Sequence, residues 1–199
     1  MEIWYFMNYS LYVCDTETTG LLDVHDVIEL SLIRLSDNVQ KTWFIKPINM
    51  ASIDMDALRI NGHKLEDLNH ETKYGRDTYK NPSDIIIEVE NWLMEDDLPK
   101  ENRVMVAQNC AFDKRMLEQL WIKCNSNDSF PFGRRTLDTM QIEFFLNWCQ
   151  NKMLEGYSLS NITKKYGIKN DKAHSAASDT KATKEVFQKQ VDFFKNVLK

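Results

Sequence analysis

An apolar run that ends in two acids is the feature that most limits how this chain can fold. Residues 11–14, Leu-Tyr-Val-Cys, lead directly into Asp15, and Gly20 stops the segment five residues later. A short apolar run bounded by a turn residue is typical of a buried strand. Because residues two apart in a strand point to the same face, Asp15 and Glu17 are expected to present their carboxylates side by side, with Thr16 pointing the other way.

Two adjacent carboxylates repel each other unless a cation lies between them. Side-chain oxygens of this kind favour a hard divalent metal ion, Mg²⁺ or Mn²⁺. The simpler alternative is a strand end with two solvated acids, and an Asp-x-Glu pattern alone does not separate the two interpretations. The choice depends on what the rest of the chain contributes.

The order of the remaining elements predicts the fold class. Residues 11–15, 27–35 and 39–45 read as three strands with short connections, which form an antiparallel meander. Strands over residues 103–108 and 136–139 then alternate with helices. The helices are expected over residues 55–60, from residue 82, and over 111–122, 140–149, 158–167 and 175–198. This order predicts an α/β fold with a mixed five-stranded sheet flanked by helices, in which sites collect at the carboxyl ends of strands.

The stretch from residue 64 to residue 81 is polar and is expected to form an irregular loop or short helical turns. It contains Lys73, Arg76 and Lys80, whose charges either face solvent or contact phosphate.

Composition bounds the class of protein. With 199 residues, 43% of them apolar, the chain can bury a full core and is expected to form a single domain over residues 1–199. No apolar stretch is long enough to span a bilayer, so no membrane association is expected. Glu2 stands where a signal peptide would carry lysine or arginine, which predicts a cytoplasmic, intracellular protein.

The cysteines argue against a zinc knuckle, and the net charge argues against a protein that coats nucleic acid. Four cysteines lie far apart with no Cys-x-x-Cys pair, so we expect reduced, buried thiols and no zinc knuckle. They are Cys14, Cys110, Cys124 and Cys149. A net charge of −5 argues against a protein that coats nucleic acid through a basic face. It leaves open an enzyme that holds phosphates through bound metal ions.

Two later segments add chemistry to the first. Asn109 and Asp113 lie where the fourth strand passes into a helix, and His174 and Asp179 lie where a loop leads into the last helix. Taken singly, Asp113 would be a surface acid that complements a helix dipole, and His174 would be an ordinary polar residue. Small residues around Asp179 would let its helix approach a sheet closely.

The three segments together resemble a known family. Asp15-x-Glu17-Thr-Thr-Gly, Asn109-x-x-Phe-Asp113 and His174-x-Ala-x-x-Asp179 have the order and spacing of the motifs of 3′-to-5′ exonucleases with four acids and a histidine (DEDDh type), a branch that includes polymerase proofreading subunits. The resemblance runs over residues 11–187. It implies a ribonuclease H-like fold and hydrolysis of nucleic-acid phosphodiesters from the 3′ end by two Mg²⁺ or Mn²⁺ ions.

Carried over by position, the resemblance implies roles for five residues. Asp15, Glu17 and Asp179 would hold one metal ion, Asp15 would bridge to a second ion supported by Asp113, and His174 would take a proton from the attacking water. The resemblance also implies contacts with the terminal nucleotide, although Leu21 could equally belong to the core. The implied substrate-binding residues are Thr18, Thr19, Gly20, Leu21, Asn109 and Phe112.

Three positions depart from the family pattern. Gln108 stands where relatives often have histidine, Asn61-Gly62-His63 replaces His-Gly-Ile, and Lys172 replaces an arginine. None of them is one of the five positions implied in catalysis, but they leave the choice between DNA and RNA open.

The expected substrates are single-stranded or frayed 3′ ends, with DNA favoured over RNA, and a DNA polymerase is a candidate partner. The alternatives are an RNA-trimming exoribonuclease and a catalytically silent nucleic-acid or polymerase-binding module. Such modules usually lose one or more of the acids, and here all four are present.

Overall fold

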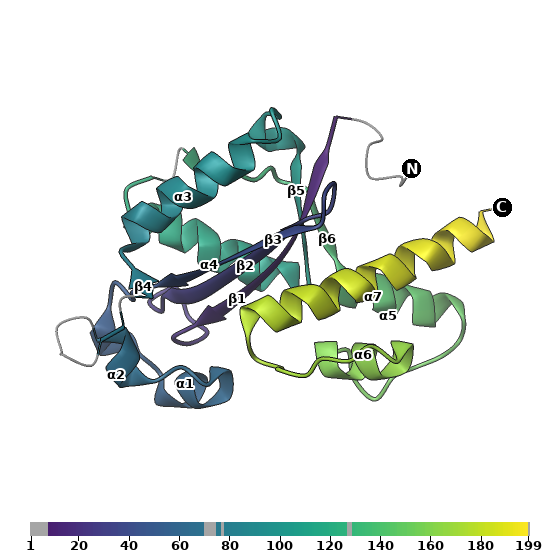
Figure 1. Cartoon of the computed structure of the whole chain (residues 1–199). Coiled ribbons are helices and arrows are strands. Elements are labelled where there is room, and N and C mark those ends of the chain that lie inside the picture. Colours follow the sequence, from purple (N-terminus) through teal and green to yellow (C-terminus); the bar gives the residue numbers. More distant parts are fainter. Residues whose placement is uncertain (1–7, 70–74, 77, 127–128, 199) are drawn as a thin grey trace.

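The computed structural model describes residues 8–69, 75–76, 78–126 and 129–198. Within them, one mixed sheet with the strand order β4-β3-β2-β1-β5-β6 forms the centre of the molecule, and helices cover it (Figure 1). The strands are β1 (Ser10–Thr18), β2 (Val27–Arg34), β3 (Val39–Ile45), β4 (Tyr79–Lys80), β5 (Arg103–Ala107) and β6 (Thr136–Asp138). The α-helices are α1 (Met55–Asn61), α2 (Leu65–Leu68), α3 (Pro82–Met94), α4 (Cys110–Lys123), α5 (Thr139–Cys149), α6 (Leu159–Tyr166) and α7 (Ala176–Val197).

The sheet combines the predicted meander with parallel strands. Strand β1 pairs antiparallel with β2, and β2 pairs antiparallel with β3. On its other side β1 pairs parallel with β5, which pairs parallel with β6. The α/β fold class and the meander are therefore confirmed.

The predicted number of five strands was wrong by one edge strand. Strand β4 lies in the stretch expected to be irregular, and it pairs parallel with β3 through only two residues, Tyr79 and Lys80. A two-residue strand carries no periodicity, so only its tertiary pairing reveals it. Of the cations in this stretch, Arg76 pairs with Asp67 and Lys80 pairs with Glu88. Lys73 lies outside the described residues.

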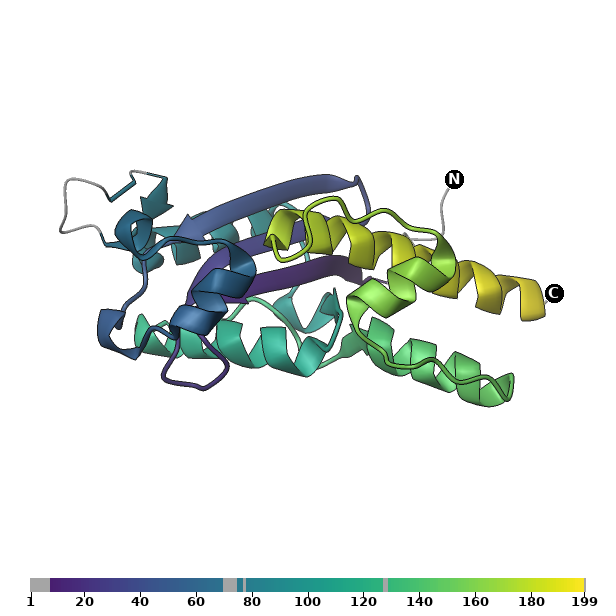
Figure 2. The same cartoon turned by 90° about the horizontal axis from the view of Figure 1, so that it is seen from below.

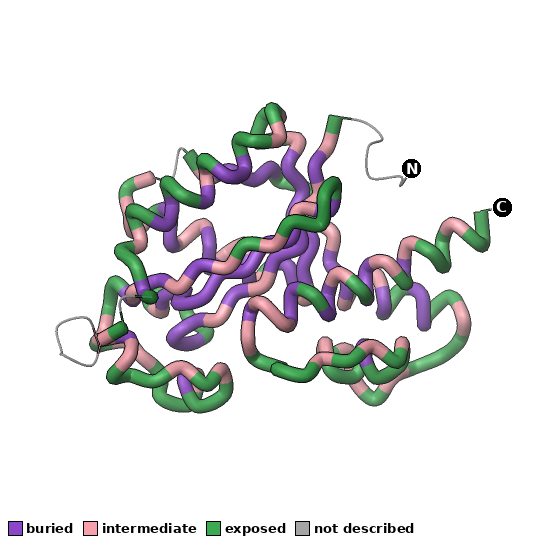
Figure 3. The backbone as a smooth tube through the Cα atoms, viewed as in Figure 1, coloured by how far each residue is buried: buried purple, intermediate pink, exposed green. Residues whose placement is uncertain are grey.

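Alternation along β1 builds a core on each face of the sheet. The central strands are buried along most of their length (Figure 3). Tyr12 and Cys14 belong to the larger cluster, which contains residues of α3 and α4 such as Trp92 and Trp121. Val13 points to the opposite face and clusters with Phe187 of α7. Helix α7 thus lies on the face to which Asp15 and Glu17 also point.

The cysteine prediction holds only in part. All four cysteines are free, and Cys14 and Cys110 are buried. Cys124 is half-buried and Cys149 is exposed, so the expectation that all four are buried was wrong. Cys149 is the last residue of α5, where the helix end faces solvent.

The ends of the helices follow local chemistry. Asn81 accepts a hydrogen bond from the Ser83 amide at the start of α3, and Ser158 accepts one from Asn161 at the start of α6. Gly62 ends α1 in the left-handed region (φ 74°), which turns the chain toward His63. Across the described residues, every helix is too short or too polar to cross a bilayer.

Candidate functional site

The end of β1 and the start of α7 bring three acids together. Side-chain oxygens of Asp15, Glu17 and Asp179 lie within 4.8 Å of one another. Asp15 and Glu17 share a face of β1, as their spacing predicts, and Asp179 lies in the first turn of α7. Helix α7 contacts both β1 and β2, and the two views show its start over these strands (Figures 1 and 2). Three converging carboxylates form a ligand set for a hard divalent cation.

In the part of the chain that the structure describes, no cationic side chain pairs with the acids of this cluster. Burial raises the pKa of Asp15 well above its usual range, and the charges of Asp113, Asp179, Glu17 and Glu29 raise it further. Burial, followed by the charges of Asp179, Glu29 and Asp113, raises the pKa of Glu17 to about 8. Ionising these groups together is therefore costly unless a cation shares their charge.

Asp113 is held beside the cluster from the other face of the sheet. It lies in the first turn of α4, is buried, and accepts a hydrogen bond of 2.9 Å from the Thr16 hydroxyl. Thr16 thus points away from Asp15 and Glu17, as predicted. Burial is the largest cause of a rise in the Asp113 pKa to about 7. Asp113 is not one of the three acids whose oxygens converge, but its charge acts on Asp15 and Glu17.

The carboxylate of Asp179 is oriented by the turn that precedes α7. Its Oδ2 accepts a hydrogen bond of 3.0 Å from the backbone amide of His174, and its Oδ1 accepts one of 2.5 Å from the side chain of Asn170. His174 is exposed and adopts the left-handed conformation (φ 67°). The structure therefore places His174 next to Asp179 through the main chain and leaves its side chain accessible.

The residues after Asp15 and Glu17 form a hairpin loop, and the hydroxyl groups of its two threonines make hydrogen bonds to the main chain of that loop. The Thr18 hydroxyl donates to the Gly20 carbonyl, and the Thr19 hydroxyl accepts a bond from the Asp26 amide. At Gly20 (φ 155°) an added Cβ would lie 2.4 Å from the His25 ring, so another residue would have to displace that ring and adopt a backbone conformation that favours glycine. Leu21 is 70% exposed. The alternative that Leu21 belongs to the core was therefore wrong.

Asn109 and Phe112 lie across from this loop at the start of α4. Asn109 precedes the helix in the left-handed conformation (φ 62°), and Phe112 is partly buried against the larger core cluster. Arg115 stacks over the Phe112 ring at 5.6 Å and donates to the Leu21 carbonyl. Arg115 thus links the Phe112 ring to the main chain of Leu21, the two apolar residues that the resemblance assigns to the terminal nucleotide.

Two residues of the site were missed from the sequence. Glu29 of β2 is buried, is paired with Glu17 across the sheet, and adds to the pKa rise of Asp15 and Glu17. Its signal was a lone glutamate inside the apolar run Val-Ile-Glu-Leu. No sequence pattern indicated Asn170, because its hydrogen bond to Asp179 forms only when the turn before α7 brings the two residues together.

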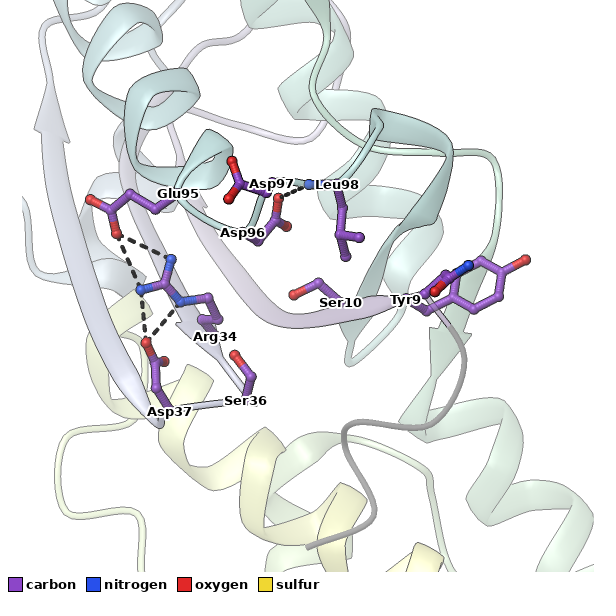
Figure 4. Close-up of a pocket in the computed structure, with 10 residues that line it drawn as sticks. Tyr9, Ser10, Arg34, Ser36, Asp37, Glu95, Asp96, Asp97 and Leu98 are labelled. Carbon is purple, nitrogen blue, oxygen red and sulfur yellow. Dashed lines mark hydrogen bonds and ion pairs between the residues drawn. The ribbon is translucent and has the colours of Figure 1, made fainter.

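A second acidic region lies at the other end of β1. A hollow of about 440 Å³ is lined by Ser10, Arg34, Asp37, Glu95 and Asp96 among others. Arg34 lies between Asp37 and Glu95 and pairs with both (Figure 4). Asp37, Glu95 and Asp96 of this hollow already pair with arginine, so it is a weaker candidate for a metal site than the cluster of Asp15, Glu17 and Asp179.

Comparison with protein families and curated proteins gives consistent matches. A family model described as RNase_T, exonuclease, matches residues 12–187. A DNA polymerase III of the PolC type from Thermotoga petrophila is 27% identical over 196 residues, and one from Staphylococcus haemolyticus is 24% identical over 189 residues. The matches cover 96% and 93% of this chain. The chain spans only 12% of the length of each polymerase.

Solved structures with the same fold include two nucleases. Exonuclease I aligns with a TM-score of 0.72 at 16% identity, covering 92% of this chain and 40% of that one. Cell-death related nuclease 4 aligns with a TM-score of 0.74 at 15% identity, covering 92% and 64%. These likenesses confirm the predicted ribonuclease H-like fold.

Proposed function

Because the chain belongs to the RNase_T exonuclease family, we propose that it removes nucleotides from 3′ ends by a two-metal hydrolysis centred on Asp15, Glu17 and Asp179. Membership of the family confirms the resemblance drawn from the sequence, that of a 3′-to-5′ exonuclease with four acids and a histidine. The observation that carries the mechanistic proposal is the convergence of three carboxylates within 4.8 Å.

The residues present fit divalent metal ions. The converging oxygens are the ligands that Mg²⁺ and Mn²⁺ prefer, and the raised pKa values of Asp15 and Glu17 reflect a charge that a cation would offset. We assign Asp15, Glu17 and Asp179 to one ion, and Asp15 with Asp113 to a second. Bound ions of this kind activate a water molecule and stabilise the entering and leaving oxygens.

His174 supplies the proton acceptor in this proposal. Its neutral imidazole takes a proton from the attacking water. The hydrogen bond from its amide to Asp179 keeps the residue beside the acids, while its exposed side chain can reach a substrate phosphate.

The terminal nucleotide is proposed to lie between Leu21 and Phe112. Both side chains offer apolar surface, and Arg115 fixes the spacing between the two segments. We propose that Thr18, Thr19 and Gly20 fix the shape of the loop on one side of the nucleotide. Asn109 lies on the opposite side of the same proposed site. A terminal nucleotide must be unpaired to enter such a site, which favours single strands and frayed ends over blunt duplexes.

Substrate and partner follow from the relatives. Because the curated relatives are named as DNA polymerases, we propose DNA ahead of RNA as the substrate and a DNA polymerase as a partner. A single exonuclease domain over residues 1–199 and an intracellular location complete the proposal.

The test compares oligonucleotides labelled at one end. Single-stranded DNA, blunt duplex DNA and RNA, each labelled at the 3′ or the 5′ end, are incubated with the protein and Mg²⁺ or Mn²⁺. We expect early release of 3′ label as mononucleotide, fastest on single-stranded DNA and abolished by excess EDTA. Fragments from a circular substrate, or hydrolysis that persists in EDTA, would contradict the proposal. Faster hydrolysis of RNA would replace DNA as the assigned substrate.

A further inference from the structure

His63, where this chain departs from the family pattern, is buried beside the candidate site. Its side chain is 6% exposed and follows the left-handed Gly62 at the end of α1. Its Nδ1 lies 2.5 Å from the Tyr79 hydroxyl, and its Nε2 lies 3.2 Å from Oε2 of Glu29. The imidazole therefore joins a residue of the unexpected strand β4 to the buried carboxylate of β2.

The direction of these hydrogen bonds depends on the tautomer of His63. Burial, followed by the charges of Asp67 and Glu29, raises the pKa of Tyr79 to about 12, so its hydroxyl keeps its proton at neutral pH. In the tautomer that carries its proton on Nε2, the imidazole accepts from the Tyr79 phenol at Nδ1 and donates to Glu29. In that arrangement one imidazole satisfies both Tyr79 and Glu29.

Glu29 uses its other oxygen at the start of α7. Ser175, the residue before the helix, makes no side-chain capping bond. Instead, Oε1 of Glu29 accepts a hydrogen bond of 3.3 Å from the Ala177 amide and one of 3.5 Å from the Ser175 hydroxyl. An anion at a helix N-terminus stabilises that end of the helix. The start of α7 is therefore capped by a residue of the sheet.

We propose that Tyr79, His63 and Glu29 form a positioning relay that holds the first turn of α7, and with it the Asp179 carboxylate, against Asp15 and Glu17. Asp179 lies two residues beyond Ala177, so a displacement of the helix start moves its carboxylate directly. The relay rests on the proposed function, because the placement of Asp179 matters for metal binding and turnover. It acts through Asp179 and contacts no substrate.

The same turn also touches the end of β1. The Asn61 side chain donates to the Thr18 carbonyl at 3.1 Å. The end of α1 is thereby fixed to the strand that carries Asp15 and Glu17, while His63 is bonded to the residue that caps α7. This double attachment fits a role in setting the relative positions of the two elements that supply the acids.

Three variants test the relay. His63→Leu removes both hydrogen bonds, His63→Gln retains an amide that can donate to Glu29, and Tyr79→Phe removes only the hydroxyl. The measurements are Mn²⁺ affinity by calorimetry, kcat and KM on an oligonucleotide, and hydrogen exchange of the Ala177 amide. The matched control is Tyr157→Phe, since the Tyr157 hydroxyl is buried and makes no hydrogen bond to the described residues.

We expect His63→Leu to weaken Mn²⁺ binding and to lower kcat by roughly 10- to 100-fold, the usual effect of removing residues that orient metal ligands. KM should stay within about twofold, and Ala177 exchange should accelerate by about tenfold. His63→Gln should retain most of the wild-type Mn²⁺ affinity and kcat. Tyr79→Phe should show the same changes on a smaller scale, and Tyr157→Phe should show none.

Unchanged Mn²⁺ affinity and Ala177 exchange in both His63→Leu and Tyr79→Phe would overturn the relay and leave His63 a packing residue. If His63→Leu does not fold, Tyr79→Phe decides, because it removes one hydroxyl and keeps the packing. A wild-type protein that cleaves no nucleic acid would overturn the proposed function alone. The exchange of Ala177 would still test the relay, because it needs neither metal nor substrate.

Discussion

Acids cluster near both ends of β1, but most of those near its start are paired with arginine, whereas those at its end lie beside further acids. At its start, Asp37 and Asp96 are bonded to Arg34 and Arg103, and although burial opposes this, those bonds hold the pKa of each carboxyl below its usual range. At its end, Asp15 and Glu17 are half-buried beside other acids, and desolvation together with those charges raises both pKa values.

The difference separates acids whose charge is paired with arginine from acids of the proposed metal site, which lie beside further acids. An acid paired with arginine is neutralised within the protein, and its removal exposes a lone cation. An acid surrounded by acids destabilises the protein until a cation arrives. Among the described residues, the candidate site can therefore be recognised by acids that pair with no cation, as well as by its motifs.

The largest expected effect is that of Asp15→Asn. It removes a charge assigned to two metal ions, so Mn²⁺ binding should collapse and cleavage should slow by about 10³-fold or more, since several kcal/mol of charge stabilisation is lost. The metal-free variant should nevertheless melt at a higher temperature than the wild type, because repulsion in the cluster is relieved. Calorimetric titration, single-turnover cleavage and thermal melting measure the three quantities. Normal cleavage by Asp15→Asn would end the two-metal assignment.

His174→Asn should slow cleavage by roughly 10² to 10⁴, the usual contribution of a general base. Asparagine tolerates the left-handed backbone of this position but accepts no proton from water. Mn²⁺ affinity should stay near that of the wild type, which distinguishes a base from a ligand. Asp171→Ala on the same exposed turn is the control for disturbance of the loop. Loss of metal binding in His174→Asn would make the histidine a ligand.

At the other end of β1, Asp96→Asn should destabilise the fold and leave the chemistry intact. It leaves Arg103, whose side chain is 6% exposed, without its carboxylate, at a cost of about 3–5 kcal/mol. Urea unfolding measures the loss, and single-turnover cleavage at low temperature, where the variant is folded, should match the wild type. Metal binding lost along with stability would show that the two ends of the strand are coupled.

The two ends should also give opposite pH slopes of stability. Glu17 and Asp113 have folded pKa values of about 8 and 7, above their unfolded values, so their contribution to stability is full below the unfolded pKa and lost as pH rises through the folded pKa. Asp37 and Asp96 behave in reverse, because their stabilisation is lost as pH falls through their lowered pKa values.

Melting of the metal-free protein between pH 5 and pH 9 checks this expectation. The melting temperature should fall by a few °C or more toward the alkaline end, on the order of 2–4 °C per kcal/mol for a chain of this size. Saturating Mn²⁺ should cancel the fall, and Asp15→Asn should reduce it. An alkaline fall that Mn²⁺ leaves unchanged would place its origin outside the acid cluster.

Sequence reasoning succeeded where structure is local and failed where it depends on distant pairing. The alternation in β1 predicted the shared face of Asp15 and Glu17, and the small residues before Asp179 predicted the close approach of its helix. Glu29 carries the same kind of charge, but its bonds to His63 and α7 exist only once the sheet has formed. Strand β4 was missed for the same reason, since its pairing with β3 is tertiary.

The smallest expected effect concerns substrate affinity, which should depend on one end of β1 and not on the other. Leu21→Ala removes an exposed apolar side chain in the loop that follows Asp15 and Glu17, at the end of β1. We expect KM for single-stranded DNA to rise about fivefold, because about 1 kcal/mol of contact with a base is lost. Both kcat and the melting temperature should change little, because Leu21 is largely exposed. The matched control is Leu98→Ala, since Leu98 lines the hollow at the other end of β1. It should lower the melting temperature slightly and leave KM unchanged. A raised KM in Leu98→Ala, or an unchanged KM in Leu21→Ala, would move the proposed nucleotide contact away from the end of β1 that carries the unpaired acids.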